Sequence, residues 1–322
     1  MTALDGLGFP EALRWRDGAL WFSDMFRSRV LRWVPGSAPT VVLDAAGGGP
    51  TVPGGLGWLP DDAHGRGDLL VVDCERRRVL RLPVDAAGRA AGDVSVHADL
   101  AHVMTHSAND MHVDPDGTAW VGGYGFDPEN DEPVPSPLVR VAPDGAVSTT
   151  ASVFVFPNGC ERDASGALLV AETFADSVSL LSQDNEVTSR ARFAAGSGPD
   201  GLSIAPDGTV YVALAFVGAL ARLAPIAGDD RKAGPDAEPT IVYYAEPIAA
   251  GPGAGPLGVY DCAVLPDPAH ADPLHADPAH ADPAHADPAH PDAHRIAVAM
   301  ASLDEDLAMR VDTGRIVILE LS

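Results

Sequence analysis

The strongest constraint on the fold is a repeat of short strand-like segments. Each copy has an apolar segment, a turn that ends in glycine, a second apolar segment and a third one with basic residues, as in ALWFSD followed by RVLRWV. One leucine of the third segment recurs at steps of 49, 58, 42 and 40 residues: Leu31, Leu80, Leu138, Leu180 and Leu220. Repeats of this length with several strands each are typical of β-propellers, in which stacked blades bury one another's faces.

The number of copies predicts an all-β fold, a six-bladed β-propeller that forms one domain over residues 1–322. Five copies are clear, and the sixth combines YDCAVLP, HRIAVAM and LAMRVD, with GRIVILEL closing the chain. The third strand of this last copy is expected near Met309. We also expect the two chain ends to share one blade. A seventh blade stays open, because the sixth copy is distorted.

Residues 267–294 form a low-complexity His/Asp/Pro loop inserted in the last blade. The segment has a period of five and holds six of the eleven histidines together with six aspartates. Proline at every fifth position prevents a continuous helix, and the composition offers no core. Imidazoles could bind a divalent metal weakly, but nothing fixes a coordination geometry. We therefore expect a solvated loop outside the active site.

Four copies carry an oxygen-bearing side chain at one shared position, just before the innermost strand. Counted back from the glycine of the first turn, Glu11 lies seven positions before it, and Asn109, Asn158 and Asp200 lie eight before theirs. The innermost strands line the central channel of a propeller, so blade stacking should bring the four residues to one end of that channel. Each residue alone is readily explained as a turn or surface residue; the shared register favours a site.

The chemistry of this set predicts a central metal-binding channel. Carboxylate and amide oxygens suit a hard divalent cation, Ca²⁺ above all, with Mg²⁺ and Mn²⁺ left open. Unpaired carboxylates in a narrow channel repel each other, and a divalent ion removes that conflict. No histidine or cysteine shares the register, which disfavours a zinc–thiolate site, although Zn²⁺ itself stays open.

Four segments together resemble the senescence marker protein/gluconolactonase/luciferin-regenerating enzyme family: FPEALRWRDGALWFSDMFRSRVLRW, NDMHVDPDGTAWVGGYGFD, FPNGCERDASGALLVAETFADSVSLL and GPDGLSIAPDGTVYVA. The resemblance implies a six-bladed propeller with a divalent cation in its channel and activity on lactones. It implies metal-binding roles for Glu11, Asn158 and Asp200. It also implies that Asp200 is the general base and that Asn109 orients the substrate.

The segment before Asn109 departs from the sugar lactonases of that family, which carry an arginine two residues earlier. Here that position is Ser107, with His106 beside it. Losing an arginine removes a bidentate donor for hydroxyl or carboxylate groups, which disfavours an aldonolactone substrate. The candidate substrate-binding residues are Asn109, His106, Ser107 and Tyr124; Phe126 and Glu129 of the Tyr124 loop are candidate pocket walls, with loop packing as the alternative.

These observations predict a metal-dependent hydrolase that opens a lactone, or a related cyclic or aryl ester, with a cation-activated water. Asp200 would be the catalytic base. No GxSxG motif occurs, so the sequence does not support an acyl-enzyme route. Two alternatives stay open: a phosphotriesterase-like hydrolase on the same site, and a non-catalytic propeller that binds calcium or a sugar acid.

The net charge of the chain limits the classes of partner that it can bind. Lys plus Arg is 21 and Asp plus Glu is 46, a formal net charge of −25. So acidic a chain lacks the basic face that nucleic acids and anionic membranes require. Three widely spaced cysteines argue against a disulfide framework, and no targeting segment is visible. We expect a cytoplasmic monomer or weak homo-oligomer whose partner is a small-molecule lactone or ester.

Overall fold

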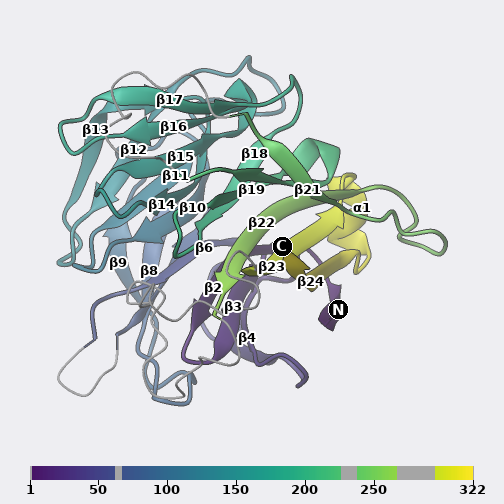
Figure 1. The fold of residues 1–322 in the computed structure, drawn as a ribbon. Helices are drawn as coiled ribbons and strands as arrows, with labels where there is room; N and C mark the ends of the chain where they lie inside the picture. Colours follow the sequence, from purple (N-terminus) through teal and green to yellow (C-terminus); the bar gives the residue numbers. More distant parts are fainter. Residues whose placement is uncertain (1, 62–66, 226–237, 267–293, 322) are drawn as a thin grey trace.

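The computed structural model describes residues 2–61, 67–225, 238–266 and 294–321, and Figure 1 shows its strands as blades around a common axis. Blade 1 contains β2 (Pro10–Arg16), β3 (Ala19–Asp24), β4 (Arg29–Trp33) and β5 (Thr40–Asp44). Blade 2 contains β6 (Pro53–Trp58), β7 (Leu69–Asp73), β8 (Arg78–Leu82) and β9 (Ser95–Asp99). Blade 3 contains β10 (Ala108–Val113), β11 (Ala119–Gly123), β12 (Ser136–Val141) and β13 (Val147–Phe154).

The remaining blades complete the ring. Blade 4 contains β14 (Pro157–Arg162), β15 (Leu168–Glu172), β16 (Ser177–Leu181) and β17 (Val187–Arg192). Blade 5 contains β18 (Pro199–Ile204), β19 (Val210–Leu214), β20 (Ala219–Leu223) and β21 (Thr240–Tyr244). Blade 6 contains β22 (Leu257–Leu265), β23 (His294–Ser302), β24 (Gly314–Leu321) and β1 (Thr2–Leu7). Short 3₁₀ turns are η1 (Met25–Arg27), η2 (Thr173–Ala175) and η3 (Ala215–Val217).

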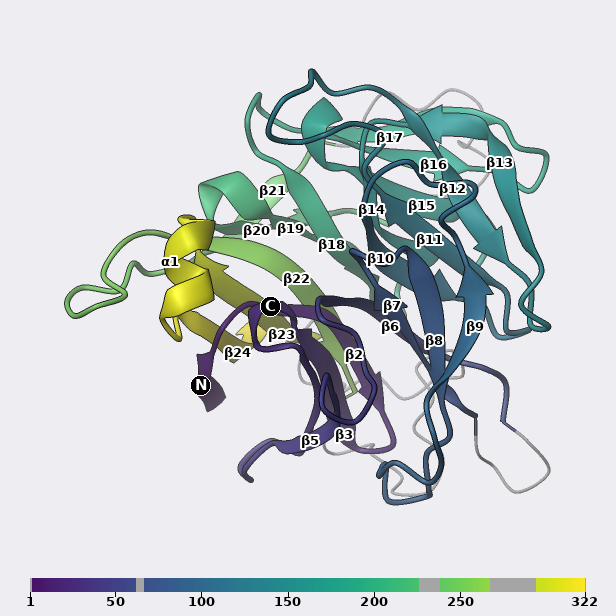
Figure 2. The same cartoon turned by 180° about the vertical axis from the view of Figure 1, so that it is seen from behind.

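The ring closes as a six-bladed propeller, which confirms the predicted all-β fold. Each innermost strand contacts the innermost strand of the next blade, and β22 contacts β2. The strand β1 pairs antiparallel with β24, with Ala3 opposite Val317, so the two ends of the chain share blade 6 as expected. In Figure 2, which views the ring from behind, the purple segment that begins at N is β1, and it lies beside β24.

The expected strand near Met309 is wrong. The segment forms the helix α1 (Glu305–Arg310), and β24 is the third strand of blade 6. Asp304 caps the helix, because its Oδ1 accepts a hydrogen bond from the Leu307 backbone N–H at 3.0 Å. Acidic residues in the first turn and Arg310 in the last add favourable charge at both helix ends.

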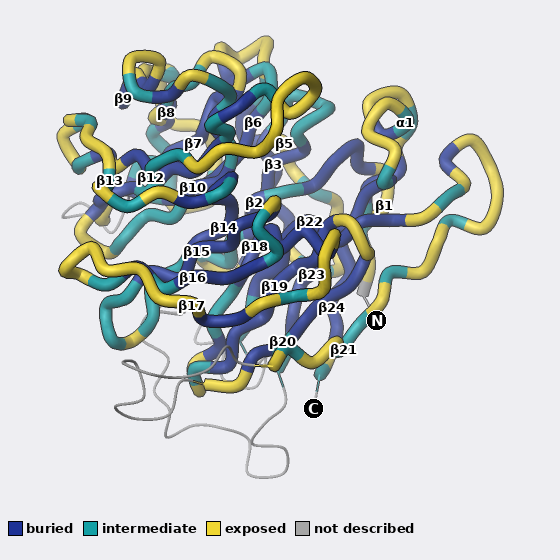
Figure 3. The backbone as a smooth tube through the Cα atoms, turned by 90° about the horizontal axis from the view of Figure 1, so that it is seen from above, coloured by how far each residue is buried: buried dark blue, intermediate teal, exposed yellow. Residues whose placement is uncertain are grey.

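Burial is highest in the second strand of most blades and lowest in the outer, fourth strand. The second strands β3, β7, β15 and β19 are buried along their whole length, because neighbouring blades cover both of their faces. This explains why these strands are apolar except for the polar residues at the ends of β3, β7 and β15. The fourth strands are only partly buried and leave residues such as Val41 and Val153 exposed. Figure 3 shows the same gradient from dark blue inner strands to yellow outer loops.

The hairpins between first and second strands lie at the end of the ring opposite the start of the innermost strands. Gly117 and Gly208 take left-handed conformations there, with φ of 87° and 86°. Asp207 stabilises its turn by accepting a hydrogen bond from the Thr209 backbone N–H at 2.9 Å. Most of the predicted tract, residues 267–293, lies outside the described residues, between β22 and β23. None of the described helices is long and apolar enough to span a membrane.

Candidate functional site

The four residues of the predicted register share one position in their blades. Each is the second residue of an innermost strand: Glu11 in β2, Asn109 in β10, Asn158 in β14 and Asp200 in β18. The residue before each pairs with the end of the second strand, and the register then shifts through a β-bulge. The structure therefore brings all four to the same end of the ring, at bulges, which commonly re-aim side chains beside active sites.

The other two blades carry glycine at this position. A Cβ on Gly54 of β6 would lie 2.3 Å from the Asn109 carbonyl oxygen, and one on Gly258 of β22 would lie 2.6 Å from the Ala215 carbonyl oxygen. Side chains do not fit at these two positions. The site is therefore asymmetric, and its polar groups come from four blades.

Two amides and a buried acid form the core of the site. Asn109 Nδ2 donates to Asn158 Oδ1 at 3.0 Å, and Asn158 Nδ2 donates to Thr173 Oγ1 at 3.2 Å. Asn158 is 3% exposed and Asp200 is 5% exposed. Asp200 Oδ1 is buried and has no hydrogen-bond partner among the described residues. Burying a carboxylate oxygen without a hydrogen-bond partner costs folding free energy, which makes Asp200 Oδ1 a candidate atom for binding a ligand.

The electrostatics of the site are dominated by buried acids. Burial raises the pKa of Glu11, and the nearby charges of Asp200, Asp261 and Asp110 raise it further. Burial also raises the pKa of Asp200, again with contributions from Asp261 and Asp110. Acids that repel one another in a dry site are stabilised in their charged form by a cation.

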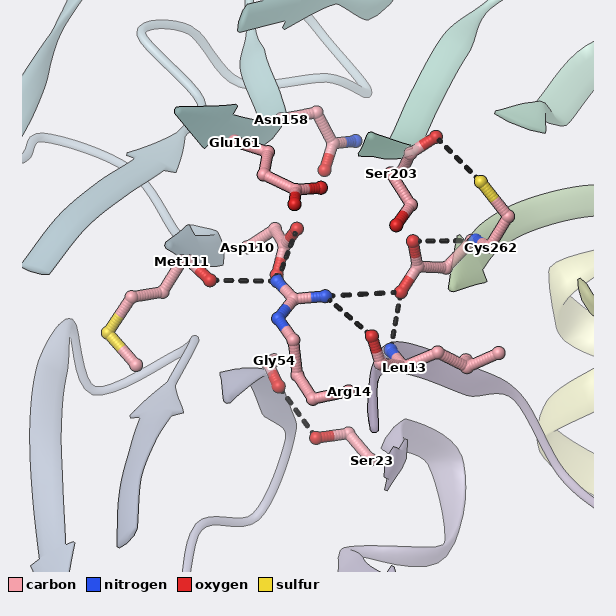
Figure 4. A network of polar contacts seen from close by, with 12 residues as sticks. Leu13, Arg14, Ser23, Gly54, Asp110, Met111, Asn158, Glu161, Ser203 and Cys262 are labelled. Atoms are coloured by element: carbon pink, nitrogen blue, oxygen red, sulfur yellow. Dashed lines mark hydrogen bonds and ion pairs between the residues drawn. The ribbon is translucent and has the colours of Figure 1, made fainter. Parts of the chain in front are cut away.

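A second polar layer lies deeper along the axis and centres on Arg14, as Figure 4 shows. Its Nη2 lies 3.1 Å from Asp110 Oδ1 and donates to the Met111 carbonyl oxygen at 2.8 Å, while its Nη1 lies 3.6 Å from Asp261 Oδ2. Burial raises the pKa of Asp261 to about 7, although Arg14 opposes this shift. One guanidinium therefore holds two acids of the deeper layer.

The sequence reasoning missed this deeper layer. Its members Arg14, Glu161 and Ser203 each lie three residues after a residue of the predicted set, and Asp261 lies three after Gly258. Strict alternation along a strand would place inward-facing residues two apart. The β-bulge adds one residue, so the inward position moves to the third. A three-residue spacing of polar side chains after the first set was the available signal.

The other candidate residues lie in connections at the same end of the ring. Tyr124 is half-buried, and its ring stacks on Phe156 with ring centroids 3.8 Å apart. The Ser107 carbonyl oxygen accepts a hydrogen bond from the Tyr124 backbone N–H at 3.0 Å, which joins the two loops. Phe126 is buried against Tyr124, and His106 is half-buried. Glu129 is exposed, and its backbone N–H donates to Asp127.

The donor set at the start of the innermost strands fits a divalent cation. Within the described part of the chain, no three side chains of His, Cys, Asp or Glu converge as a metal-binding group. The set instead has two carboxylates and two amides, so a cation there would rely on amide oxygens and water to complete its shell, as Ca²⁺ does in proteins. The unpartnered Asp200 Oδ1 and the crowding of acids both favour such an ion.

Together, the six-bladed ring and the polar residues near its axis define a class, the six-bladed β-propellers with a polar centre. The SMP-30/gluconolactonase/LRE-like family matches residues 9–247, and the chain belongs to this family. A virginiamycin B lyase of Nocardia farcinica is 28% identical over 202 residues, 61% of this chain and 60% of that protein. The chain thus spans about 60% of the length of this curated relative.

Solved structures share the fold. A luciferin-regenerating enzyme has a TM-score of 0.67 at 15% identity, with 99% of this chain and 92% of that chain covered. A calcium-binding protein, regucalcin, of Agrobacterium tumefaciens has a TM-score of 0.64 at 15% identity, with 100% and 94% covered. At such identities the likeness shows the fold alone.

Proposed function

We propose that this protein is a metal-dependent hydrolase that opens a lactone or a related ester. The observation that carries the proposal is the buried Asp200 Oδ1, unpartnered among the described residues and set among further acids at the propeller axis. The gluconolactonase-like family supports a lactonase-type activity. The calcium-binding regucalcin with the same fold supports Ca²⁺ as the first choice of metal. The proposed setting is the cytoplasm.

Glu11, Asn158 and Asp200 would hold the cation through their side-chain oxygens. When bound, the cation supplies a Lewis acid that polarises the ester carbonyl and makes a water more acidic. Asp200 would accept the proton of the attacking water on its carboxylate and pass it to the leaving oxygen as the ester C–O bond breaks, so that a lactone yields a hydroxy acid. Asn109 uses one N–H on Asn158 and keeps a second for the substrate, since an amide nitrogen carries two donors. Its role is to orient the lactone.

The test is lactone turnover by the wild type, two site variants and one control variant. Chelation should abolish activity and added Ca²⁺ should restore it, because the catalytic set is held by the ion. Asp200→Asn and Glu11→Gln should each lose activity by at least about 100-fold, whereas Asp144→Asn, in an exposed turn, should not. Full activity in both site variants would refute the proposal. Organophosphates and aryl esters in the same assay test the phosphotriesterase-like alternative, and metal binding without turnover favours a binding protein.

A second candidate is ring opening by elimination, which the virginiamycin B lyase relative favours. The same acids could remove a proton from carbon instead of from water. Hydrolysis in oxygen-18 water places one solvent oxygen in the product acid, whereas elimination adds none and leaves a carbon–carbon double bond. Mass spectrometry of the product therefore separates the two reactions.

A further inference from the structure

Aromatic side chains gather at the end of the ring where the candidate site lies. Seven of the nine phenylalanines lie in the connections at this end, where polar loop residues would be the usual choice. Five rings form one continuous set across blades 3 to 5, which we call the aromatic arc: Tyr124, Phe126, Phe156, Phe174 and Phe216. The arc crosses four separate connections, so it is not one loop folded on itself.

Each ring of the arc contacts at least one other ring of the arc. Tyr124 stacks on Phe156, Phe126 meets Phe174 edge-on with centroids 5.4 Å apart, and Phe174 lies 5.9 Å from Phe216. Phe126 and Phe156 are 3% exposed and form the base of the arc. Phe174 and Phe216 remain 38% and 43% exposed, and Val217 beside them is 46% exposed. A contiguous exposed apolar surface on a globular domain commonly marks a binding site.

Two backbone features place the arc next to the candidate metal ligands Asn158 and Asp200, which we call the ligand set together with Glu11. Phe156 has a φ of 52°, which is rare for an aromatic residue and rarer before a proline, and Asn158 follows two residues later. Gly198 has a φ of 61°, and a Cβ there would lie 2.5 Å from the Phe216 ring. Asp200 also follows two residues later. The segment that leads into each of these two candidate ligands therefore also contains or contacts a ring of the arc.

The charges around the arc disfavour an anionic group. Glu11, Asp110, Asp200 and Asp261 all lie at the axis, and Arg14 below them is already held by Asp110. Arg27 of η1 is bound to Asp312, at 2.7 Å, and to backbone carbonyls. At the axis, acidic side chains therefore outnumber the cationic side chains that accompany them. A substrate for this site should therefore be neutral.

We propose that the aromatic arc binds an apolar, preferably aromatic, substituent of a neutral lactone or ester whose carbonyl reaches the ligand set. This inference rests on the proposed function for the reaction and adds the substrate class. It separates this chain's substrate from polyhydroxylated or anionic lactones, whose groups would lose water against the exposed rings without gaining hydrogen bonds.

The experiment compares γ-phenyl-γ-butyrolactone, unsubstituted γ-butyrolactone and the corresponding phenyl-substituted lactam, which has the same shape but resists hydrolysis. The wild type should prefer the phenyl lactone by at least about tenfold in kcat/KM. Phe174→Ala and Phe216→Ala should each lower that preference by about threefold to tenfold. Phe216→Leu should retain most of it. Tyr244→Ala, at a residue that is 64% exposed on the outer strand β21, is the matched aromatic control and should leave the preference unchanged.

Binding of the lactam, followed by saturation-transfer NMR, separates this inference from the reaction itself. Lactam binding that is weakened in Phe174→Ala and Phe216→Ala supports the arc even if no lactone is turned over, in which case the proposed function fails alone. Turnover without preference for the phenyl group overturns the inference and leaves the hydrolase standing. No lactam binding, or binding that these variants do not weaken, also overturns it.

Discussion

Asn109 and Asn158, 49 residues apart in the chain, meet across the boundary of blades 3 and 4, where Asn109 Nδ2 donates to Asn158 Oδ1 at 3.0 Å. At its other end the Asn158 amide donates to Thr173 Oγ1 at 3.2 Å. The two hydrogen bonds fix the orientation of the amide, and Figure 4 shows its oxygen on the side of Glu161 and Asp110. The oxygen, which is the atom that a hard cation prefers, is thus held toward the axis.

Thr173→Val should weaken metal binding without removing a ligand. The substitution keeps the shape of the buried side chain but removes the acceptor that orients the Asn158 amide. Loss of an outer-shell partner typically costs about tenfold or more in metal affinity. Calcium titration of the chelator-treated protein measures the loss, and Thr173→Ser should restore the affinity. An unchanged affinity in Thr173→Val would show that the amide needs no such support.

Arg14→Gln should destabilise the fold strongly. The variant would leave Asp110 and Asp261, 7% and 1% exposed, without their guanidinium, and breaking a buried ion pair from one side costs about 3 kcal/mol. Urea unfolding measures this cost. Arg16→Gln is the matched control on the same strand, because Arg16 pairs with exposed Asp17 and Asp61 and should contribute at most about 1 kcal/mol. Equal costs for both variants would contradict the central role of Arg14.

Asp114 should make stability depend on acid pH. Burial alone would raise its pKa, but hydrogen bonds from His112, Arg162 and Trp120 hold the pKa well below the usual range. A lowered pKa means that the stabilisation is complete above about pH 4, the unfolded value, and is lost as the pH falls below it. Asp114→Asn should lose about 2 kcal/mol near neutral pH.

Urea unfolding midpoints measured from neutral pH downward test this expectation. Asp114→Asn should show a flatter decline below about pH 4 than the wild type does. The exposed Asp184→Asn variant is the control and should follow the wild type. A parallel decline in Asp114→Asn would assign the acid sensitivity to other groups.

Replacement of residues 267–293 by a short turn should leave metal content and activity unchanged. Leu265 pairs with Arg295 across β22 and β23, so the two strand ends already lie side by side and a short hairpin can join them. They also lie at the end of the strand away from Gly258, the position that matches the candidate ligands. Metal analysis and the lactone assay measure the outcome. A loss of either would show that the tract takes part in the site.

The repeat spacing was sufficient to predict the ring, because the blades reuse one pattern of buried second strands, and blades 1, 3, 4 and 5 also share a glycine in the first turn. The same regularity predicted that Glu11, Asn109, Asn158 and Asp200 share one position in their blades, and the structure confirms this. The last blade was harder, since α1 interrupts it where a third strand was expected. There, local capping by Asp304 outweighs the repeat.

The deeper layer and the aromatic arc could not be predicted in the same way. Arg14 and Glu161 face the axis only because bulges shift the inward register by one residue, so their three-residue spacing from the first set gains its meaning only when the bulges are known. The rings of the arc come from four connections of unequal length, and their contacts depend on how the blades stack. Such long-range relations appear only once the ring is built.

Isothermal titration of Ca²⁺ into the chelator-treated protein is the most direct test of the central claim that Glu11, Asn158 and Asp200 form a cation site. The account predicts one ion per chain in the wild type and affinity lowered by at least about 100-fold in Asp200→Asn and Glu11→Gln, with Asp144→Asn unchanged. Absence of binding by the wild type, or equal binding by the two site variants, would contradict it.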